Sequence, residues 1–213
     1  MILNIPEIRW AGILLLTGGV IFWIGAFCPP YKQWMTKDVR EYLTIINGHR
    51  PNWYFMHGAF TLGVLLTLFG VQLLTHAMTQ AGAGVYSQLA FTGFLFGSLF
   101  WIMNIAFRVT VTVWAADKLS TSATLEPSFK TWMDWTNLLF AIYMILAYLA
   151  IGIIGLAAKD LGILHTWVTS MCIWFGFAGA ALYLLRVPVF EPPLMVHTPL
   201  ILLGLFILLT IKN

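Results

Sequence analysis

The histidines have the greatest capacity of any residues in this sequence to bind a metal, because imidazole is a ligand for haem iron and for transition metals. Of the five, His57 and His197 lie near one predicted edge of a membrane, and His76 and His165 lie near the other. A membrane cytochrome with two b-type haems needs two such pairs, each drawn from two helices. The sequence therefore offers His57/His197 and His76/His165 as candidate ligands of haem b.

The spacing of two of these histidines weakens the haem hypothesis. His57 and His76 are 19 residues apart, which in a helix is about 28 Å along the axis and about 100° around it. They would lie at opposite membrane edges and on different helix faces, whereas haem ligands on one helix usually share a face. We therefore keep a b-type haem redox protein as an alternative, and our main hypothesis is a non-catalytic role.

A second candidate site comes from polar residues inside apolar segments, where an unsatisfied polar group is costly. Four polar residues of one segment fall within about 60° of one another at about 100° per residue, so they share one helix face. They are His57, Thr61, Gln72 and Thr75. We expect this face to point toward the interior of a helix bundle.

Two later segments add polar residues at the level of His57. Asn104 and Arg108 are one helical turn apart, and Asp134 and Asn137 open the next segment. An Arg108–Asp134 ion pair would neutralise both charges, and an equally good interpretation has Arg108 extending toward lipid headgroups. The candidate residues of a ligand-binding or polar bundle interior are His57, Thr61, Gln72, Asn104, Arg108, Asp134 and Asn137.

Most other chemistry is disfavoured. The sequence has no H-E-x-x-H, no G-x-S-x-G and no glycine-rich phosphate loop. No Asp, Glu or Lys is expected deep in an apolar segment, which argues against a carboxylate proton relay. Cys28 and Cys172 belong to different segments at different depths, so we expect no disulfide. A lipid-modifying enzyme that uses acids with His57 or His49 stays as a second alternative.

The composition indicates whether water or lipid surrounds most of the protein that positions these residues. The 213 residues are 60% hydrophobic and 9% charged, with a mean hydropathy of +0.87. Soluble proteins average about 25% charged residues, so a chain of this composition requires lipid around most of its surface. The net charge of +3 is too small and too scattered for a nucleic-acid groove, and we expect no nucleic-acid partner.

Apolar segments divide the chain into six candidate membrane spans in one domain of residues 1–213. A span needs about 20 apolar residues, and the last segment is marginal because Pro199 lies in its first turns. No internal repeat is evident, which disfavours a transporter built of inverted halves. The segments are 9–28, 54–77, 86–108, 134–157, 163–186 and 194–211.

Six spans place both termini on one side, which we call face A, and the segments 29–53, 109–133 and 187–193 on the other, face B. Face A has three basic residues (Arg9, Lys159, Lys212). Since cytoplasmic loops are enriched in Lys and Arg, the bias predicts a cell-membrane protein with face B in the cytoplasm. Face B has eight basic residues: Lys32, Lys37, Arg40, Arg50, Arg108, Lys118, Lys130 and Arg186.

Face B also carries signals of ordered structure. An apolar stripe spaced three and four residues apart predicts an amphipathic helix over 36–47, capped by Thr36 and ended by Gly48 in the left-handed conformation. Its length and pattern suit the membrane interface. The stripe comprises Met35, Val39, Tyr42, Leu43 and Ile46. The aromatic residues near this face suit an interfacial belt, and they are Trp34, Trp53, Tyr54, Trp114, Trp132 and Trp135.

Small residues at four-residue spacing indicate where helices touch, because in lipid close approach replaces the hydrophobic drive for association. Gly93 and Gly97 form one such pair, and Gly176 and Ala180 form another. Packing within the bundle explains both pairs. Any stripe that the bundle leaves uncovered would suit another membrane subunit.

The sequence thus predicts an all-α integral membrane protein: six transmembrane helices, with a short interfacial amphipathic helix between the first two. We expect a polar mouth on face B, formed by 36–47, 109–133 and the Glu191-Pro192-Pro193 turn. The main hypothesis is non-catalytic, either binding of a lipid or hydrophobic ligand or service as an accessory subunit of a larger membrane complex. Membrane lipids are the expected partners, and bound lipid the expected ligand.

Overall fold

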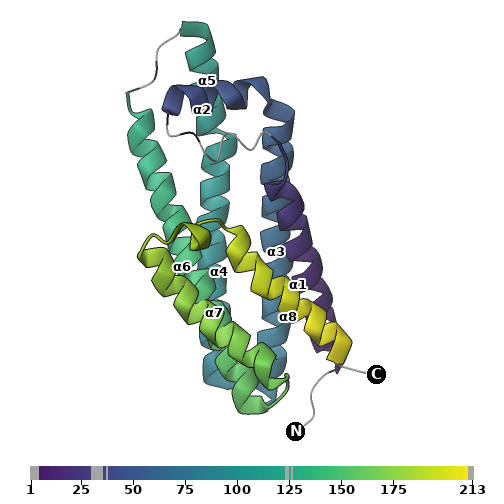
Figure 1. Cartoon of the computed structure of the whole chain (residues 1–213). Coiled ribbons are helices and arrows are strands. Elements are labelled where there is room, and N and C mark those ends of the chain that lie inside the picture. Colours follow the sequence, from purple (N-terminus) through teal and green to yellow (C-terminus); the bar gives the residue numbers. More distant parts are fainter. Residues whose placement is uncertain (1–4, 30–35, 37, 123–124, 126, 211–213) are drawn as a thin grey trace.

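The computed structural model describes residues 5–29, 36, 38–122, 125 and 127–210, and all regular structure within them is helical (Figure 1). Several residues of the sequence-based predictions, namely Lys32, Trp34, Met35, Lys37 and Lys212, lie outside the described residues. The elements are α1 (Ile5–Ala26), α2 (Val39–Gly48), α3 (Arg50–Gln80), α4 (Gly84–Val109), α5 (Val111–Ser122), α6 (Phe129–Leu161), α7 (Thr166–Leu184), the 3-10 turn η2 (Pro188–Phe190) and α8 (Leu194–Thr210).

Five helical stretches are long and apolar enough to cross a membrane: α1, α3, α4 together with α5, α6 and α7. The last helix, α8, is apolar but has only 17 residues. Each predicted span overlaps one of these helices, and the helix boundaries differ from the predicted ones by a few residues. The described part of the chain is therefore all-helical, with five helical stretches of the length and apolar character that a membrane bundle requires.

The segment 109–133 differs most from the prediction, because much of it is helix. After a break at Thr110, α5 continues almost in line with α4 (Figure 1). Its Val113, Ala115 and Ala116 are buried, and α5 packs against α2. Polar residues interrupt this short apolar face, so the segment has too weak a pattern to be recognised from sequence.

Helix α2 confirms the predicted apolar stripe and corrects both predicted ends. Tyr42, Leu43 and Ile46 are buried. The start is capped by Asp38, whose carboxylate accepts the Glu41 amide at 2.8 Å, and not by Thr36. At the other end Gly48 is still helical, so it does not provide the left-handed cap. The helix crosses the upper end of the bundle in Figure 1.

Helix α1 lies between α3 and α8 and touches both through glycines. A methyl group added at Gly63 of α3 would lie 2.8 Å from the carbonyl oxygen of Gly18 in α1. On the other side of α1, a methyl at Gly204 of α8 would lie 2.7 Å from the carbonyl oxygen of Gly12. The backbones therefore meet without intervening side chains, as expected for helices that pack in lipid.

The two predicted small-residue stripes also pack within the chain. Gly97 of α4 faces Tyr143 and Leu146 of α6, and Gly176 of α7 lies directly against Gly152 of α6. The contacts of α4 with α6, and of α6 with α7, account for both stripes without another subunit.

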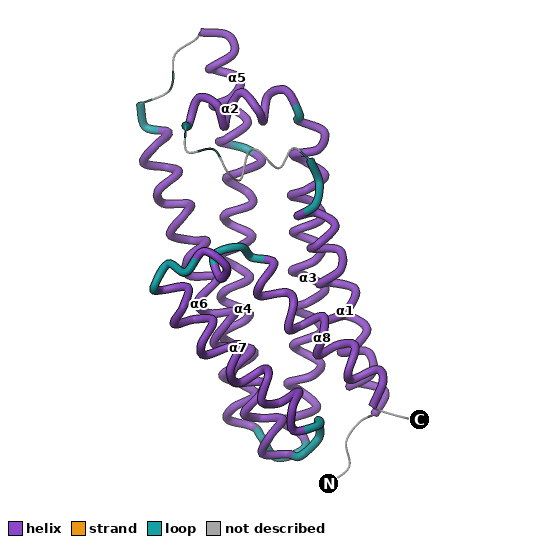
Figure 2. Tube along the Cα trace, viewed as in Figure 1, coloured by secondary structure: helices purple, strands orange, loops and turns teal. Residues whose placement is uncertain are grey.

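The helices differ greatly in length. With 31 residues in α3 and 33 in α6, these helices are about 46 and 50 Å long, whereas α7 and α8, with 19 and 17 residues, are about 28 and 26 Å long at about 1.5 Å per residue. The connection between α7 and α8 consequently lies partway along α6, below the end that carries α2 and α5 (Figure 2). Because α7 and α8 are shorter than α3 and α6, their connection lies beside the candidate site.

Candidate functional site

A cleft of about 450 Å³ lies between α3, α4 and α6 at the level of the α7–α8 connection. Its aromatic and aliphatic wall includes Phe60, Trp101, Ile105, Phe140 and Leu194. Its polar groups are His57, Asn104, Arg108, Asn137 and Glu191. Of the three segments predicted to form a polar mouth on face B, the Glu191-Pro192-Pro193 turn lines this cleft, whereas none of the lining residues comes from 36–47 or 109–133.

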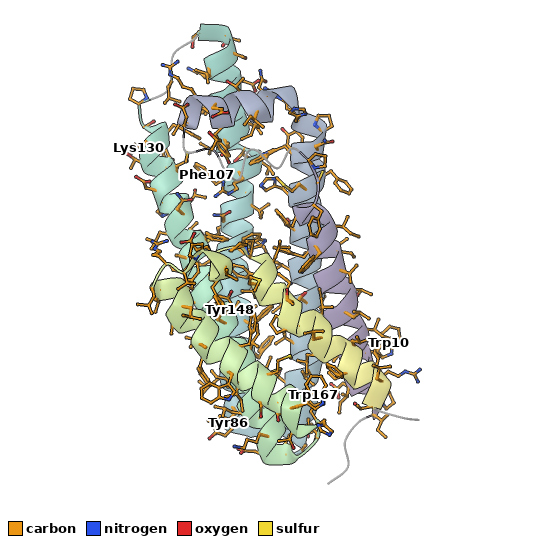
Figure 3. The ribbon with its side chains drawn as sticks, viewed as in Figure 1. Trp10, Tyr86, Phe107, Lys130, Tyr148 and Trp167 are labelled. Carbon is orange, nitrogen blue, oxygen red and sulfur yellow. The ribbon has the colours of Figure 1, made fainter. Side chains whose placement is uncertain are left out.

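The connection that closes one side of the cleft contributes Pro188, Pro192 and Pro193. A hydrogen bond attaches it to α6, because the hydroxyl of Tyr148 donates to the carbonyl oxygen of Phe190 at 3.1 Å. Tyr148 is labelled in Figure 3. Helix α7 ends before these prolines, in a turn where Arg186 has a positive φ of 59°, and Pro192 and Pro193 directly precede α8. The cleft wall is therefore a short, anchored turn.

Arg108 connects three elements around the cleft. Its Nε donates to Oδ1 of Asn104 at 3.0 Å, and its Nη1 donates to the hydroxyl of Tyr42 in α2 at 2.9 Å. A longer contact of 3.5 Å joins Nη2 to Oδ1 of Asn137 in α6. The predicted ion pair with Asp134 is absent among these contacts: Asp134 is exposed and is not part of the cleft lining.

The neighbours of Arg108 are themselves fixed. Buried Asn104 donates to the carbonyl oxygen of Thr136 in α6 at 2.8 Å. Burial raises the pKa of the Tyr42 phenol, with the Arg108 guanidinium acting in the opposite direction, so the phenol keeps its proton at neutral pH. Trp53 is buried and donates to the carbonyl oxygen of Arg108 at 3.0 Å, so it is a packing residue and not the belt residue that we predicted.

His57 presents one free nitrogen. Its Nδ1 lies 2.7 Å from the carbonyl oxygen of Trp53, one turn earlier in α3. Because a carbonyl oxygen only accepts, Nδ1 carries the proton, and Nε2 of the neutral ring has the lone pair. The ring is 1% exposed, and Nε2 has no hydrogen-bond partner among the described residues. Trp101 of α4 is similar, since it is buried with an unpartnered Nε1.

The other histidines lie outside the cleft. His197 is buried, its Nε2 lies 3.0 Å from the hydroxyl of Tyr143, and its ring stacks on Phe22 with centroids 3.8 Å apart. His76 has an exposed side chain 3.9 Å from a Glu7 carboxylate oxygen, and His165 precedes α7 as its N-cap. No group of three or more His, Cys, Asp or Glu among the described residues could hold a metal ion.

The polar stripe predicted on α3 is divided between separate places. Thr61 is half-buried and donates to the carbonyl oxygen of His57 at 2.9 Å. Gln72 is exposed and lines a different cavity of about 470 Å³ with Glu7 and His76, near the other end of the bundle. Of the seven candidate residues, the cleft brings together His57, Asn104, Arg108 and Asn137.

Sequence reasoning missed the aromatic wall and the role of Trp101. The signal was present in α4, where residues 101, 104, 105 and 108 follow the spacing of one helix face and all line the cleft. The pocket combines this wall with polar groups that are mostly already hydrogen-bonded, an arrangement suited to holding a molecule. Comparison of the chain with protein-family models, with curated proteins and with solved structures found no match.

Proposed function

We propose that the protein spans the cell membrane six times and binds an amphipathic small molecule, drawn from the lipid phase, in the cleft below α2 and α5. The observation that carries this proposal is the cleft itself, with aromatic Trp101 and Phe140 on its wall and Arg108 and Glu191 among its polar groups. Its volume of about 450 Å³ falls within the range of small-molecule sites, roughly 300–1,000 Å³.

The height of the cleft supports a ligand that has both an apolar and a polar part. Helices α7 and α8 are about 28 and 26 Å long, close to the roughly 30 Å thickness of the hydrocarbon core. If both cross the core, the turn between them marks its face-B boundary, and α2 lies at the interface beyond it. An amphipathic molecule would then place its head in the cleft while its tail stays in hydrocarbon.

The test is lipid retention after purification of the full chain in mild detergent. Asn137 and Leu138 are adjacent and both exposed, but only Asn137 lines the cleft. We expect Asn137→Trp to fill the edge of the cleft and reduce lipid bound per protein at least about 10-fold, the equivalent of about 1.4 kcal/mol. Leu138→Trp should leave it unchanged. Mass spectrometry of the extracted lipid measures both, and equal retention in the two variants would contradict the proposal.

The orientation proposed from the charge bias places face B in the cytoplasm. Its basic residues within the described part of the chain include Arg40, Lys118 and Lys130. In a background without Cys28 and Cys172, an impermeant maleimide applied to intact cells should label Asp160→Cys on face A and not Thr121→Cys on face B. Both positions are exposed. Labelling of Thr121→Cys alone would reverse the orientation.

A further inference from the structure

Two side chains that line the cleft each carry a buried polar atom that the described residues leave without a partner: Nε2 of His57 and Nε1 of Trp101. Both side chains are almost fully buried, at 1% and 3% exposure. Both rings lie near that of Phe60, whose centroid is 5.9 Å from that of His57 and 5.8 Å from that of Trp101. Two unpaired buried groups on residues that line one cavity are a cost to the fold, which a bound molecule that reaches them can remove.

The two atoms have opposite hydrogen-bonding requirements. Because Nδ1 of His57 donates to Trp53, Nε2 is an acceptor, whereas the indole N–H of Trp101 is only a donor. An ether, an ester or an ionised carboxylate accepts hydrogen bonds but cannot donate to His57. A hydroxyl group both donates and accepts, so it is the simplest head that complements both atoms.

The charges in the cleft also favour a neutral head. The nitrogens of the Arg108 guanidinium already donate to Asn104, Tyr42 and Asn137. Glu191 lines the same cleft and brings a negative charge to it. A carboxylate or phosphate head would meet a guanidinium whose donors are largely engaged, together with a like charge from Glu191.

We infer that the cleft selects a lipid alcohol, whose hydroxyl group donates to Nε2 of His57 and accepts from the N–H of Trp101. The apolar body packs against Phe60, Phe140 and Leu194. This inference rests on the proposed function and names the ligand class of the same site.

The first test compares three probes that share one chain: oleyl alcohol, its methyl ether and oleate. Equilibrium binding of each radiolabelled probe to the full chain in detergent should favour the alcohol about 10-fold over the other two, because each of those leaves His57 unpaired. Parallel measurements with dioleoylglycerol, cholesterol and a short-chain ubiquinol identify the source of the hydroxyl, as a glyceride, a sterol or a quinol.

The second test changes the two polar atoms. In His57→Asn the shorter amide can keep the bond to the Trp53 carbonyl but has no atom at the position of Nε2, whereas the longer side chain of His57→Gln can place one there. We expect the preference for alcohol over ether to disappear in His57→Asn and to return in part in His57→Gln. Trp101→Phe removes the N–H donor and should also reduce the preference, which keeps the test decisive if His57→Asn does not fold.

The outcomes separate this inference from the proposed function. Equal binding of alcohol and ether by the unchanged protein, with both lost in Asn137→Trp, would overturn the selectivity for alcohols and retain the cleft as a lipid site. Binding that Asn137→Trp does not alter would overturn the cleft itself. Preference for the alcohol that survives both His57→Asn and Trp101→Phe would assign it to other groups and would also overturn this inference.

Discussion

Helix α3 takes part in two kinds of packing. On one side Gly63 and Gly70 bring its backbone against α1, where added methyl groups would lie 2.8–3.1 Å from atoms of α1. Toward the cleft, the same helix presents large side chains, His57 and Phe60, and a volume of about 450 Å³ remains between the helices. This contact between α1 and α3, which we call the seam, leaves no space for another molecule, whereas the cleft does.

The difference shows what determines whether helices of a membrane bundle pack closely or leave a cleft between them. Lipid gives apolar helices no hydrophobic reason to associate, so close packing depends on small residues and complementary shape. Around the cleft, α3, α4 and α6 carry aromatic and polar side chains instead, and hydrogen bonds of Asn104 and Arg108 join α4 to α6 and to α2. Close packing and open space thus lie on different sides of one helix, and three variants compare the close packing against α1 with the contacts that hold α2 and α5 above the cleft.

The largest effect is expected at the seam. A methyl at Gly63 would lie 2.8 Å from the Gly18 carbonyl oxygen and 2.9 Å from the Phe22 amide nitrogen, both backbone atoms that cannot rotate away. Gly63→Ala should therefore cost about 2–3 kcal/mol through overpacking. The control is Gly58→Ala on the same helix, where a methyl meets nothing within 4 Å. Unfolding in mixed micelles compares the two, and equal stability would refute tight packing at the seam.

A smaller effect is expected where α2 docks above the cleft. Tyr42→Phe removes the hydroxyl that accepts from Arg108 and should cost about 1–2 kcal/mol, since a charged donor loses a buried partner. The loss should appear as faster amide hydrogen exchange in α2, with no change in α1. Tyr86→Phe, at an exposed tyrosine near the opposite end, is the control. Similar exchange in both variants would mean that the Arg108 contact does not hold α2.

The smallest effect is expected from the ion pair between Arg50 and Asp117, which links the start of α3 to α5. Its side chains are 31% and 51% exposed, and pairs in such positions contribute about 0–1 kcal/mol. Asp117→Asn should increase exchange in α5 slightly at low salt and not at high salt. A larger increase in hydrogen exchange than in Tyr42→Phe would mean that this surface ion pair, and not the contact of Arg108 with Tyr42, is the main attachment of α2 and α5.

Most of the fold was predictable because the bilayer imposes length and composition on its helices. Apolar segments of the required length mark the helices that are long enough to cross it, and the stripe at Tyr42, Leu43 and Ile46 identified α2. Helix α5 was not predictable, because its apolar face is short and Asp117, Lys118 and Ser120 interrupt the pattern. Its buried residues pack against α2, a contact that no local pattern contains.

The site was predictable only in part. Helical phase placed polar residues on one side of α3, but it cannot say which neighbour lies at each height, so Gln72 and His57 belong to different cavities. The Arg108–Asp134 pair failed for a similar reason. Asn137, three residues further along α6, faces Arg108 and occupies the position that we had expected for Asp134.

The three prolines of the α7–α8 turn have a consequence for the thermodynamics of binding. Their rings fix the backbone φ angle, so this wall of the cleft has little conformational entropy left to lose when a ligand packs against it. They also remove three amide donors from a turn at the proposed boundary of the hydrocarbon. A ligand bound there as we propose would meet a preorganised surface, and its residence time should depend more on the contacts it makes than on ordering of the wall.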